Sequence, residues 1–240
     1  MERQRIAIGP SEQERIGYIF RPAALEERPC PAALLIHGWE SAQDRMFGLA
    51  AQLVARGFIC LTLDLRGHGE SSGDRDALSR KDFFADVVAA YDTLAAENAV
   101  DRPRIGAVGS SFGGHLAAML SAERPLAWVI LRVPADYPDD TFEVPRAQDA
   151  DSKLAWRSQP RAWEETAAMR AMHAFEGPVL IVEAGNDELV PRQLILNYKS
   201  AIGENAEHQV IEGAPHSFTR FPHFQERFNA MVEDWLARKV

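Results

Sequence analysis

The stretch RIGAVGSSFGGHLAAML, residues 104–120, contains two adjacent serines between small residues. An apolar run precedes the serines and a segment able to form a helix follows them, which predicts a sharp strand-to-helix turn. Ser111 is the centre of GSSFG (109–113), which fits the G-x-S-x-G nucleophile-elbow pattern, whereas no such frame is centred on Ser110. Glycines suit this turn because the residues on either side of the serine come into close contact. Ser111 is therefore a candidate nucleophile.

A glycine-rich strand-to-helix turn can also bind phosphate, so this alternative has to be weighed. The stretch lacks the Lys-Ser/Thr of a P-loop and the G-x-G-x-x-G of a dinucleotide-binding turn. A lone G-x-S-x-G occurs often by chance. A catalytic role for Ser111 therefore depends on finding a base and an orienting carboxylate elsewhere in the chain.

A carboxylate and a histidine follow Ser111 in the chain order expected for a nucleophile-elbow hydrolase. Asp187 comes just after the apolar run PVLIVEAG (178–185), and His216 comes just after a weaker strand, HQVIEG (208–213). Both therefore lie where a predicted strand ends, at the sheet edge where Ser111 should also lie. We predict that the three side chains converge there as a catalytic triad, with Asp187 orienting the imidazole that accepts the serine proton.

The other acidic residues and histidines fit these roles less well. Glu183 lies inside the apolar run and is interpreted as structural, and Glu188 is a weaker second candidate for the carboxylate. Four histidines are placed less suitably for the base, by their positions on a predicted strand or helix or in an insertion: His115, His173, His208 and His223.

The negative charge that develops during acyl transfer needs two hydrogen-bond donors. One is expected to be the backbone N–H of Phe112, directly after the candidate nucleophile. The other is expected to be the N–H of Trp39, because Gly38 lets the loop after an earlier apolar run turn tightly. His37 is interpreted as a structural residue that holds this loop.

Short apolar runs alternate with helix-period segments, as is typical of a parallel sheet covered by helices. Two shorter segments near the N-terminus, around Arg5–Ile8 and Ile16–Phe20, predict a hairpin at one edge of the sheet. Ser79 is a candidate N-cap for a helix predicted by the helical spacing of apolar residues that follow it: Phe84, Val87, Val88, Tyr91 and Leu94. The apolar runs are AALLIH (32–37), FICLTLD (58–64), RIGAVGS (104–110), LAWVILRV (126–133), PVLIVEAG (178–185) and HQVIEG (208–213).

Residues 134–177 interrupt this alternation with a long segment rich in Asp and Pro. Because long connections often form lids or binding loops, we interpret it as a cap insertion within a single domain over residues 1–240. The alternative is a solvated acidic loop followed by one packing helix. Four side chains of the segment are predicted to line an apolar substrate pocket, although they could equally be ordinary packing: Trp156, Trp163, Met169 and Met172.

The composition is that of a globular protein, with 46% hydrophobic and 25% charged residues. Its net charge of −9 argues against binding nucleic acid or an anionic membrane. No window is apolar enough for a membrane span, and MERQRIAIGP (1–10) lacks a secretion signal, so a cytoplasmic location is expected. Cys30 and Cys60 do not suggest a disulfide framework. No metal or organic cofactor is expected, and the sequence is compatible with a monomer or a homodimer.

Ser111, Asp187, His216 and HGW (37–39) together resemble the α/β-hydrolase superfamily, and the resemblance covers essentially the whole chain. DLRGHGESSG (64–73) is similar to that family's loop after the fourth strand, where Asp64 and Arg66 are expected to tie loops together. The resemblance implies an α/β-hydrolase fold, with a mostly parallel central sheet and helices on both faces.

Departures from family variants narrow the chemistry that the resemblance implies. Dehalogenases and epoxide hydrolases of this fold carry Asp at the elbow and dienelactone hydrolases carry Cys, whereas this chain has Ser111. The oxyanion loop is HGW, not the HGGG of hormone-sensitive-lipase-like esterases. The layout is most similar to esterases with a short insertion, such as feruloyl or cinnamoyl esterases.

The resemblance therefore implies a carboxylesterase-type serine hydrolase that cleaves small-molecule esters through an acyl-enzyme on Ser111, without a cofactor. A thioesterase, an amidase or a carbon–carbon hydrolase would use the same triad. A non-catalytic binding protein on the same fold is the alternative from another class, because fold alone does not determine function.

Overall fold

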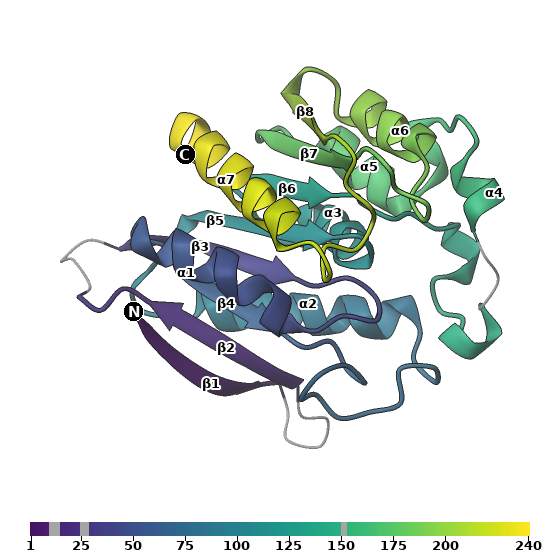
Figure 1. The fold of residues 1–240 in the computed structure, drawn as a ribbon. Helices are drawn as coiled ribbons and strands as arrows, with labels where there is room; N and C mark the ends of the chain where they lie inside the picture. Colours follow the sequence, from purple (N-terminus) through teal and green to yellow (C-terminus); the bar gives the residue numbers. More distant parts are fainter. Residues whose placement is uncertain (10–14, 25–28, 150–152) are drawn as a thin grey trace.

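The computed structural model describes residues 1–9, 15–24, 29–149 and 153–240, which form one eight-stranded sheet between two layers of helices (Figure 1). The strand order is β1-β2-β4-β3-β5-β6-β7-β8. β1 pairs antiparallel with β2 and β2 with β4, while the other neighbours are parallel. The strands are β1 Glu2–Ile8, β2 Arg15–Arg21, β3 Cys30–Ile36, β4 Ile59–Leu63, β5 Val100–Ser110, β6 Val129–Arg132, β7 Val179–Ala184 and β8 Ala206–Ile211.

Helices α1 and α7 cover one face of the sheet, and α2, α3, α5 and α6 cover the other (Figure 1). The helices are α1 Phe47–Ala55, α2 Arg80–Ala95, α3 Phe112–Glu123, α4 Leu154–Arg157, α5 Ala167–Ala174, α6 Arg192–Ile202 and α7 Pro222–Lys239. Short 3₁₀ turns are η2 Gln43–Met46, η3 Asp139–Thr141, η4 Arg146–Gln148, η5 Trp163–Glu165 and η6 Gly203–Asn205. This architecture confirms the predicted mostly parallel α/β sheet with helices on both faces.

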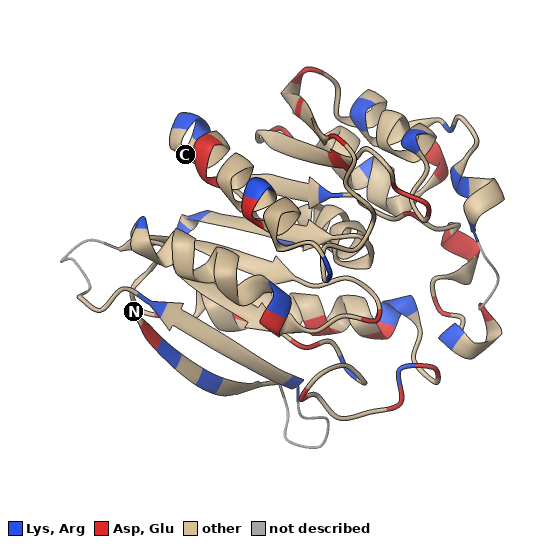
Figure 2. Cartoon of the chain, in the orientation of Figure 1, with Lys and Arg blue, Asp and Glu red and all other residues tan. Residues whose placement is uncertain are grey.

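The central strands are apolar because both of their faces are covered. Every residue of β4 and of β7 is buried, which explains why these runs show no alternation of polar and apolar residues. The predicted N-terminal hairpin is confirmed as β1 and β2, with β1 at the edge of the sheet. Charged residues Glu2, Arg3 and Arg5 are exposed along β1 (Figure 2), and such charges discourage pairing with another chain.

Helix α2 begins at the predicted cap residue. The Ser79 hydroxyl accepts the Asp82 backbone N–H, and the Asp82 carboxylate accepts the Ser79 N–H at 2.9 Å. This reciprocal capping box satisfies two N–H groups that the first helical turn leaves without partners. Its effect is to define where α2 starts beside the carboxyl end of the sheet.

Asp64 and Arg66 connect the loop after β4 to neighbouring segments, as expected from the sequence. Asp64 accepts the Gln43 backbone N–H and side-chain amide, each at 2.8 Å, and the Glu70 N–H at 2.9 Å. Arg66 donates from Nε to the Asp86 carboxylate at 2.8 Å. These bonds hold residues 64–73 in place next to the loop that follows β3.

The Asp86 carboxylate joins three parts of the fold. It lies on α2, is fully buried, and accepts hydrogen bonds from Arg15 Nε on β2 at 2.5 Å and from Arg66. A carboxylate placed between two buried guanidinium groups balances charges that would otherwise be costly to remove from water.

Replacing Asp86 by alanine is expected to lower the free energy of unfolding by about 3–5 kcal/mol, because two buried arginines lose the buried carboxylate that they share. Urea unfolding followed by circular dichroism measures this difference. Asp92→Ala is the matched control, since Asp92 lies on the same helix but forms an exposed ion pair with Arg124. That control should cost about 1 kcal/mol or less, and equal losses for the two variants would contradict the prediction.

Candidate active site

Ser111 occupies a strained turn between β5 and α3. Its φ is 54° and its ψ is −113°, a conformation that non-glycine residues rarely adopt. The flanking glycines leave the necessary room: a Cβ on Gly109 would overlap the Gly113 carbonyl, and one on Gly113 would overlap the carbonyls of Ile36 and His37. The turn is thus packed against the end of β3, and the Ser111 side chain is held at the carboxyl edge of the sheet.

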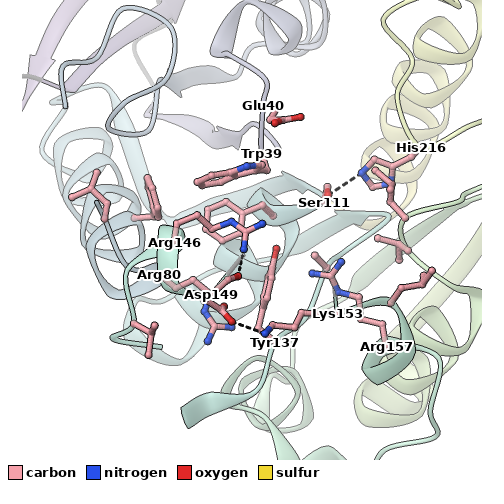
Figure 3. A pocket seen from close by; sticks show the side chains of 18 of the residues that line it. Trp39, Glu40, Arg80, Ser111, Tyr137, Arg146, Asp149, Lys153, Arg157 and His216 are labelled. Atoms are coloured by element: carbon pink, nitrogen blue, oxygen red, sulfur yellow. Dashed lines mark hydrogen bonds and ion pairs between the residues drawn. The ribbon is translucent and has the colours of Figure 1, made fainter. Parts of the chain in front are cut away.

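The structure brings the three residues of the predicted triad together. His216 Nε2 lies 2.9 Å from Ser111 Oγ, and His216 Nδ1 lies 2.7 Å from Asp187 Oδ2 (Figure 3 shows the serine contact). The other carboxylate oxygen, Oδ1, accepts the backbone N–H groups of Leu189 and Val190, each at 2.8 Å. The Asp187 side chain is 4% exposed and the His216 side chain 13% exposed. The Leu189 and Val190 N–H groups therefore orient the Asp187 carboxylate, and this carboxylate orients the His216 imidazole.

The competing residues are engaged elsewhere. Glu183 accepts a hydrogen bond from His208 at 2.8 Å, which links β7 to β8. His115 is buried, and its Nδ1 lies 3.2 Å from the Asp136 carboxylate. Burial lowers the pKa of His115. Neither of these two contacts involves Ser111.

His37 holds the loop that follows β3. The Leu65 backbone N–H donates to His37 Nε2 at 3.1 Å, so the proton is on Nδ1, which donates to the Gly38 carbonyl at 2.7 Å. Burial lowers the pKa of His37 to about 4, so the ring is neutral at physiological pH. A Cβ on Gly38 would lie 3.3 Å from Ser111 Cβ, so this loop passes directly against the serine. The structural interpretation of His37 agrees with these contacts.

Trp39 and Phe112 lie beside Ser111 and line the same cavity. Their rings pack edge to face, with centroids 5.5 Å apart. Within the described part of the chain, neither backbone N–H donates a hydrogen bond. Both N–H groups are therefore free to bind an oxygen of a ligand.

Arg132 is a residue of the site that the sequence analysis missed. At the end of β6, its Nε and Nη2 donate to Ser110 Oγ at 2.8 and 2.6 Å, and its Nη1 donates to the His216 carbonyl at 3.0 Å. The guanidinium also lies over the Phe218 ring, 4.3 Å from its centroid. Burial lowers the pKa of Arg132 to about 10, opposed by the Asp187 charge, so the group remains protonated at neutral pH.

A signal for Arg132 was present in the sequence. It is the one charged residue of the run LAWVILRV (126–133), in which every other residue is apolar. A buried charge is costly unless it has partners, so a charge in a buried strand indicates a specific contact.

A cavity of about 260 Å³ opens beside Ser111 and His216 (Figure 3). Its wall combines aromatic and aliphatic groups with charged ones. Eight of the lining residues lie between Ala135 and Arg157, and five of these eight have polar or charged side chains. Residues of the wall include Trp39, Phe83, Phe112, Tyr137, Val144, Val190, Arg80, Arg146, Asp149, Lys153 and Arg157.

The four side chains predicted to line the pocket lie elsewhere. Met169 and Met172 are fully buried in the core, because α5 packs against α3 in the helical layer. Trp163 stacks on His173, with ring centroids 3.8 Å apart. Trp156 lies beneath the Arg161 guanidinium at 3.9 Å from its ring centroid and does not line the cavity. The prediction that these four side chains line the substrate pocket is therefore wrong, and they pack against other parts of the protein instead.

This packing also divides the predicted insertion. Helix α5 belongs to the layer on the sheet, whereas residues 134–149 and 153–166 lie beyond the carboxyl ends of the parallel strands (Figure 1). Within this segment, residues 150–152 lie outside the described residues.

In the described chain, no helix is long and apolar enough to cross a membrane. The described residues also contain no group of three or more metal-ligating side chains.

Gly109→Ala is expected to lower the free energy of unfolding by about 1–3 kcal/mol or more, because the new methyl group would overlap the Gly113 carbonyl. Gly48→Ala is the control, since Gly48 lies within helix α1 and its Cβ would meet only Asn229 Nδ2 at 3.7 Å. That variant should be neutral or slightly stabilising, as alanine favours helices. Urea unfolding of both variants tests the expectation, and an unchanged stability of Gly109→Ala would contradict it.

Comparison with known proteins agrees with this geometry. Residues 27–165 match the family described as Serine aminopeptidase, S33. An uncharacterised protein of Mycobacterium tuberculosis is 27% identical over 188 residues, which cover 78% of this chain and 63% of that protein. The chain thus spans less than two thirds of the length of this relative.

Two solved structures share the fold. Est1E of Butyrivibrio proteoclasticus, with ferulic acid bound, is similar with a TM-score of 0.75 and 19% identity over 98% of each chain. The esterase Pf2001 of Pyrococcus furiosus is similar with a TM-score of 0.71 and 18% identity, covering 99% of this chain and 90% of that one. The family match extends over more than half of the sequence, and together with the fold it shows that this chain belongs to the serine aminopeptidase S33 family of α/β-hydrolases.

Proposed function

We propose that the protein is a serine hydrolase that cleaves carboxylic esters through an acyl-enzyme on Ser111. The observation that carries this proposal is the continuous hydrogen-bond chain from Asp187 through His216 to Ser111, with separations of 2.7 and 2.9 Å. A nucleophile in contact with a base, and a base oriented by a third group, is the arrangement that acyl transfer requires.

In the proposed reaction, Ser111 Oγ attacks the ester carbonyl carbon while His216 Nε2 takes the serine proton. The carbonyl oxygen becomes an oxyanion, which accepts hydrogen bonds from the Trp39 and Phe112 N–H groups. When the intermediate collapses, the ester C–O bond breaks and the imidazolium protonates the leaving alcohol. Water then attacks the acyl-enzyme by the same route, which releases the acid and restores Ser111.

The choice of an ester over other acyl substrates is supported by the neighbouring structures. Est1E is described with ferulic acid bound, and Pf2001 is described as an esterase. A thioesterase, an amidase or a carbon–carbon hydrolase would need the same triad, and no contact in the cavity favours one of them. A purely binding role is not supported, because Ser111 and His216 lie at hydrogen-bonding distance.

We propose that residues 134–166 act as a cap over this site, within a single catalytic domain. Tyr137, Val144, Arg146, Lys153 and Arg157 all come from this segment and line the cavity beside Ser111. A segment that supplies one wall of the cavity can exclude water from the acyl-enzyme and select among substrates.

Ser111→Ala is expected to abolish labelling by a fluorophosphonate and to lower ester turnover by about 10⁴-fold or more, because the nucleophile is lost. Mass spectrometry of the labelled peptide and hydrolysis of p-nitrophenyl esters measure the two effects. Ser121→Ala is the control, since Ser121 lies on α3, the helix that follows Ser111, and its hydroxyl donates to the Ala118 carbonyl. Labelling of Ser111→Ala at the wild-type level would overturn the assignment.

Arg132→Met is expected to lower kcat by up to about 10²-fold with a smaller change in KM, because the loop that carries His216 loses its anchor. Steady-state kinetics well below the unfolding temperature separates this effect from a loss of stability. Arg132→Lys should recover only part of kcat, since one ammonium cannot reproduce the three guanidinium contacts. Wild-type kcat in Arg132→Met would show that Arg132 does not position the imidazole.

A further inference from the structure

The cavity beside Ser111 is lined by more cationic than acidic side chains, in contrast to the chain as a whole. The whole chain has a net charge of −9, yet four cationic side chains line this cavity against three carboxylates. Of the carboxylates, Asp149 is paired with Lys153 at 2.5 Å, while Glu40 and Glu188 are exposed. The remaining cations are the guanidinium groups of three arginines (Figure 3): Arg80, Arg146 and Arg157.

These three arginines lack the carboxylate partner that Arg15 and Arg66 have. Arg80 is buried, and Arg146 and Arg157 are partly buried, yet no carboxylate oxygen of a described residue lies within 4 Å of their nitrogens. By contrast, Arg15 and Arg66 both pair with Asp86. A shielded cation without a counter-charge is costly, and an anionic ligand removes that cost.

Hydrogen bonds use only part of each guanidinium. Arg157 Nε donates to the Asp136 carbonyl at 3.1 Å, and no other bond of this side chain is formed with the described residues. Arg80 Nη2 donates to Pro138 O at 2.7 Å and to Thr141 Oγ1 at 2.5 Å, while its buried Nε has no partner. Arg146 donates from Nη1 to the backbone carbonyl of Asp149.

Aromatic rings hold the same groups in fixed positions. The guanidinium carbons of Arg80 and Arg157 lie 4.6 and 4.7 Å from the centroid of Tyr137, and that of Arg146 lies 5.3 Å from the centroid of Trp39. Contact through the ring face orients a guanidinium without using its N–H donors. The donors are therefore preorganised for a planar acceptor.

From this arrangement we infer that the substrate ester carries a carboxylate, and that Arg157 and Arg146 bind it in the cavity beside Ser111. The inference rests on the proposed ester hydrolysis and adds the class of substrate. A carboxylate matches the planar fork of a guanidinium, and such charge-assisted pairs are about twice as strong as neutral hydrogen bonds. Arg80 is more buried than these two arginines and donates two hydrogen bonds from Nη2, so we infer that it adds positive charge to the cavity without contacting the substrate carboxylate.

The test compares mono-p-nitrophenyl adipate, whose acyl chain ends in a carboxylate, with the neutral p-nitrophenyl hexanoate. The wild type should have the higher kcat/KM for the adipate ester. Arg157→Gln and Arg146→Gln should each lower the adipate-to-hexanoate ratio by at least about 10-fold, because a charge-assisted contact is lost. Arg170→Gln is the control, since Arg170 lies on α5, pairs with Asp139 and does not line the cavity. Its ratio should remain that of the wild type.

A preference of the wild type for the hexanoate ester, or equal losses for both esters in the two variants, would overturn the inference. Calorimetric binding of monomethyl adipate to Ser111→Ala provides a readout that does not need turnover. Binding there should weaken at least about 10-fold when Arg157→Gln is added, and absence of binding would also refute the inference. Failure of the proposed hydrolysis is distinct, because it would leave both esters uncleaved and Ser111 unlabelled by the fluorophosphonate.

Discussion

The close approach of backbone segments at the turn from β5 into α3 is the constraint on which the site depends. Gly109 and Gly113 face each other across this turn, and Gly113 also lies against the carbonyls of Ile36 and His37. Side chains at these positions would separate the segments. Because the contact is made by backbone atoms, the strained conformation of Ser111 is imposed by the fold and not by its own side-chain bonds.

The order of the strands explains how distant residues reach that serine. From β5 to β8, neighbours in the sheet are also successive in the chain, and all of them are parallel. The carboxyl ends of these strands therefore present Ser111, Arg132, Asp187 and His216 along one edge. Arg132 lies on the strand between the serine and the aspartate, and its bonds to Ser110 and to the His216 carbonyl link the two sides.

The strands, the edge hairpin and the convergence of Ser111, Asp187 and His216 could be predicted from the sequence, because each depends on a local apolar run and the turn that ends it. The pocket wall could not. Helix α5 has an apolar face that suits either a cavity or a core, and only its packing on α3 places Met169 and Met172 in the core. Sequence spacing contains no information on which neighbour that face will meet.

The positive charge of the cavity, which comes from Arg80, Arg146 and Arg157, could not be predicted from the sequence for a related reason. Arg146 and Arg157 belong to a segment rich in aspartate, where charges are usually solvated and largely screened from one another. The net charge of the chain acts mainly at long range, where salt screens it within about 8 Å at physiological ionic strength. Inside the cavity the nearest groups dominate, and these are guanidinium groups held on Tyr137 and Trp39. An acidic protein can therefore present a site that favours anions, so a negative net charge does not by itself argue against a small anionic ester as the substrate.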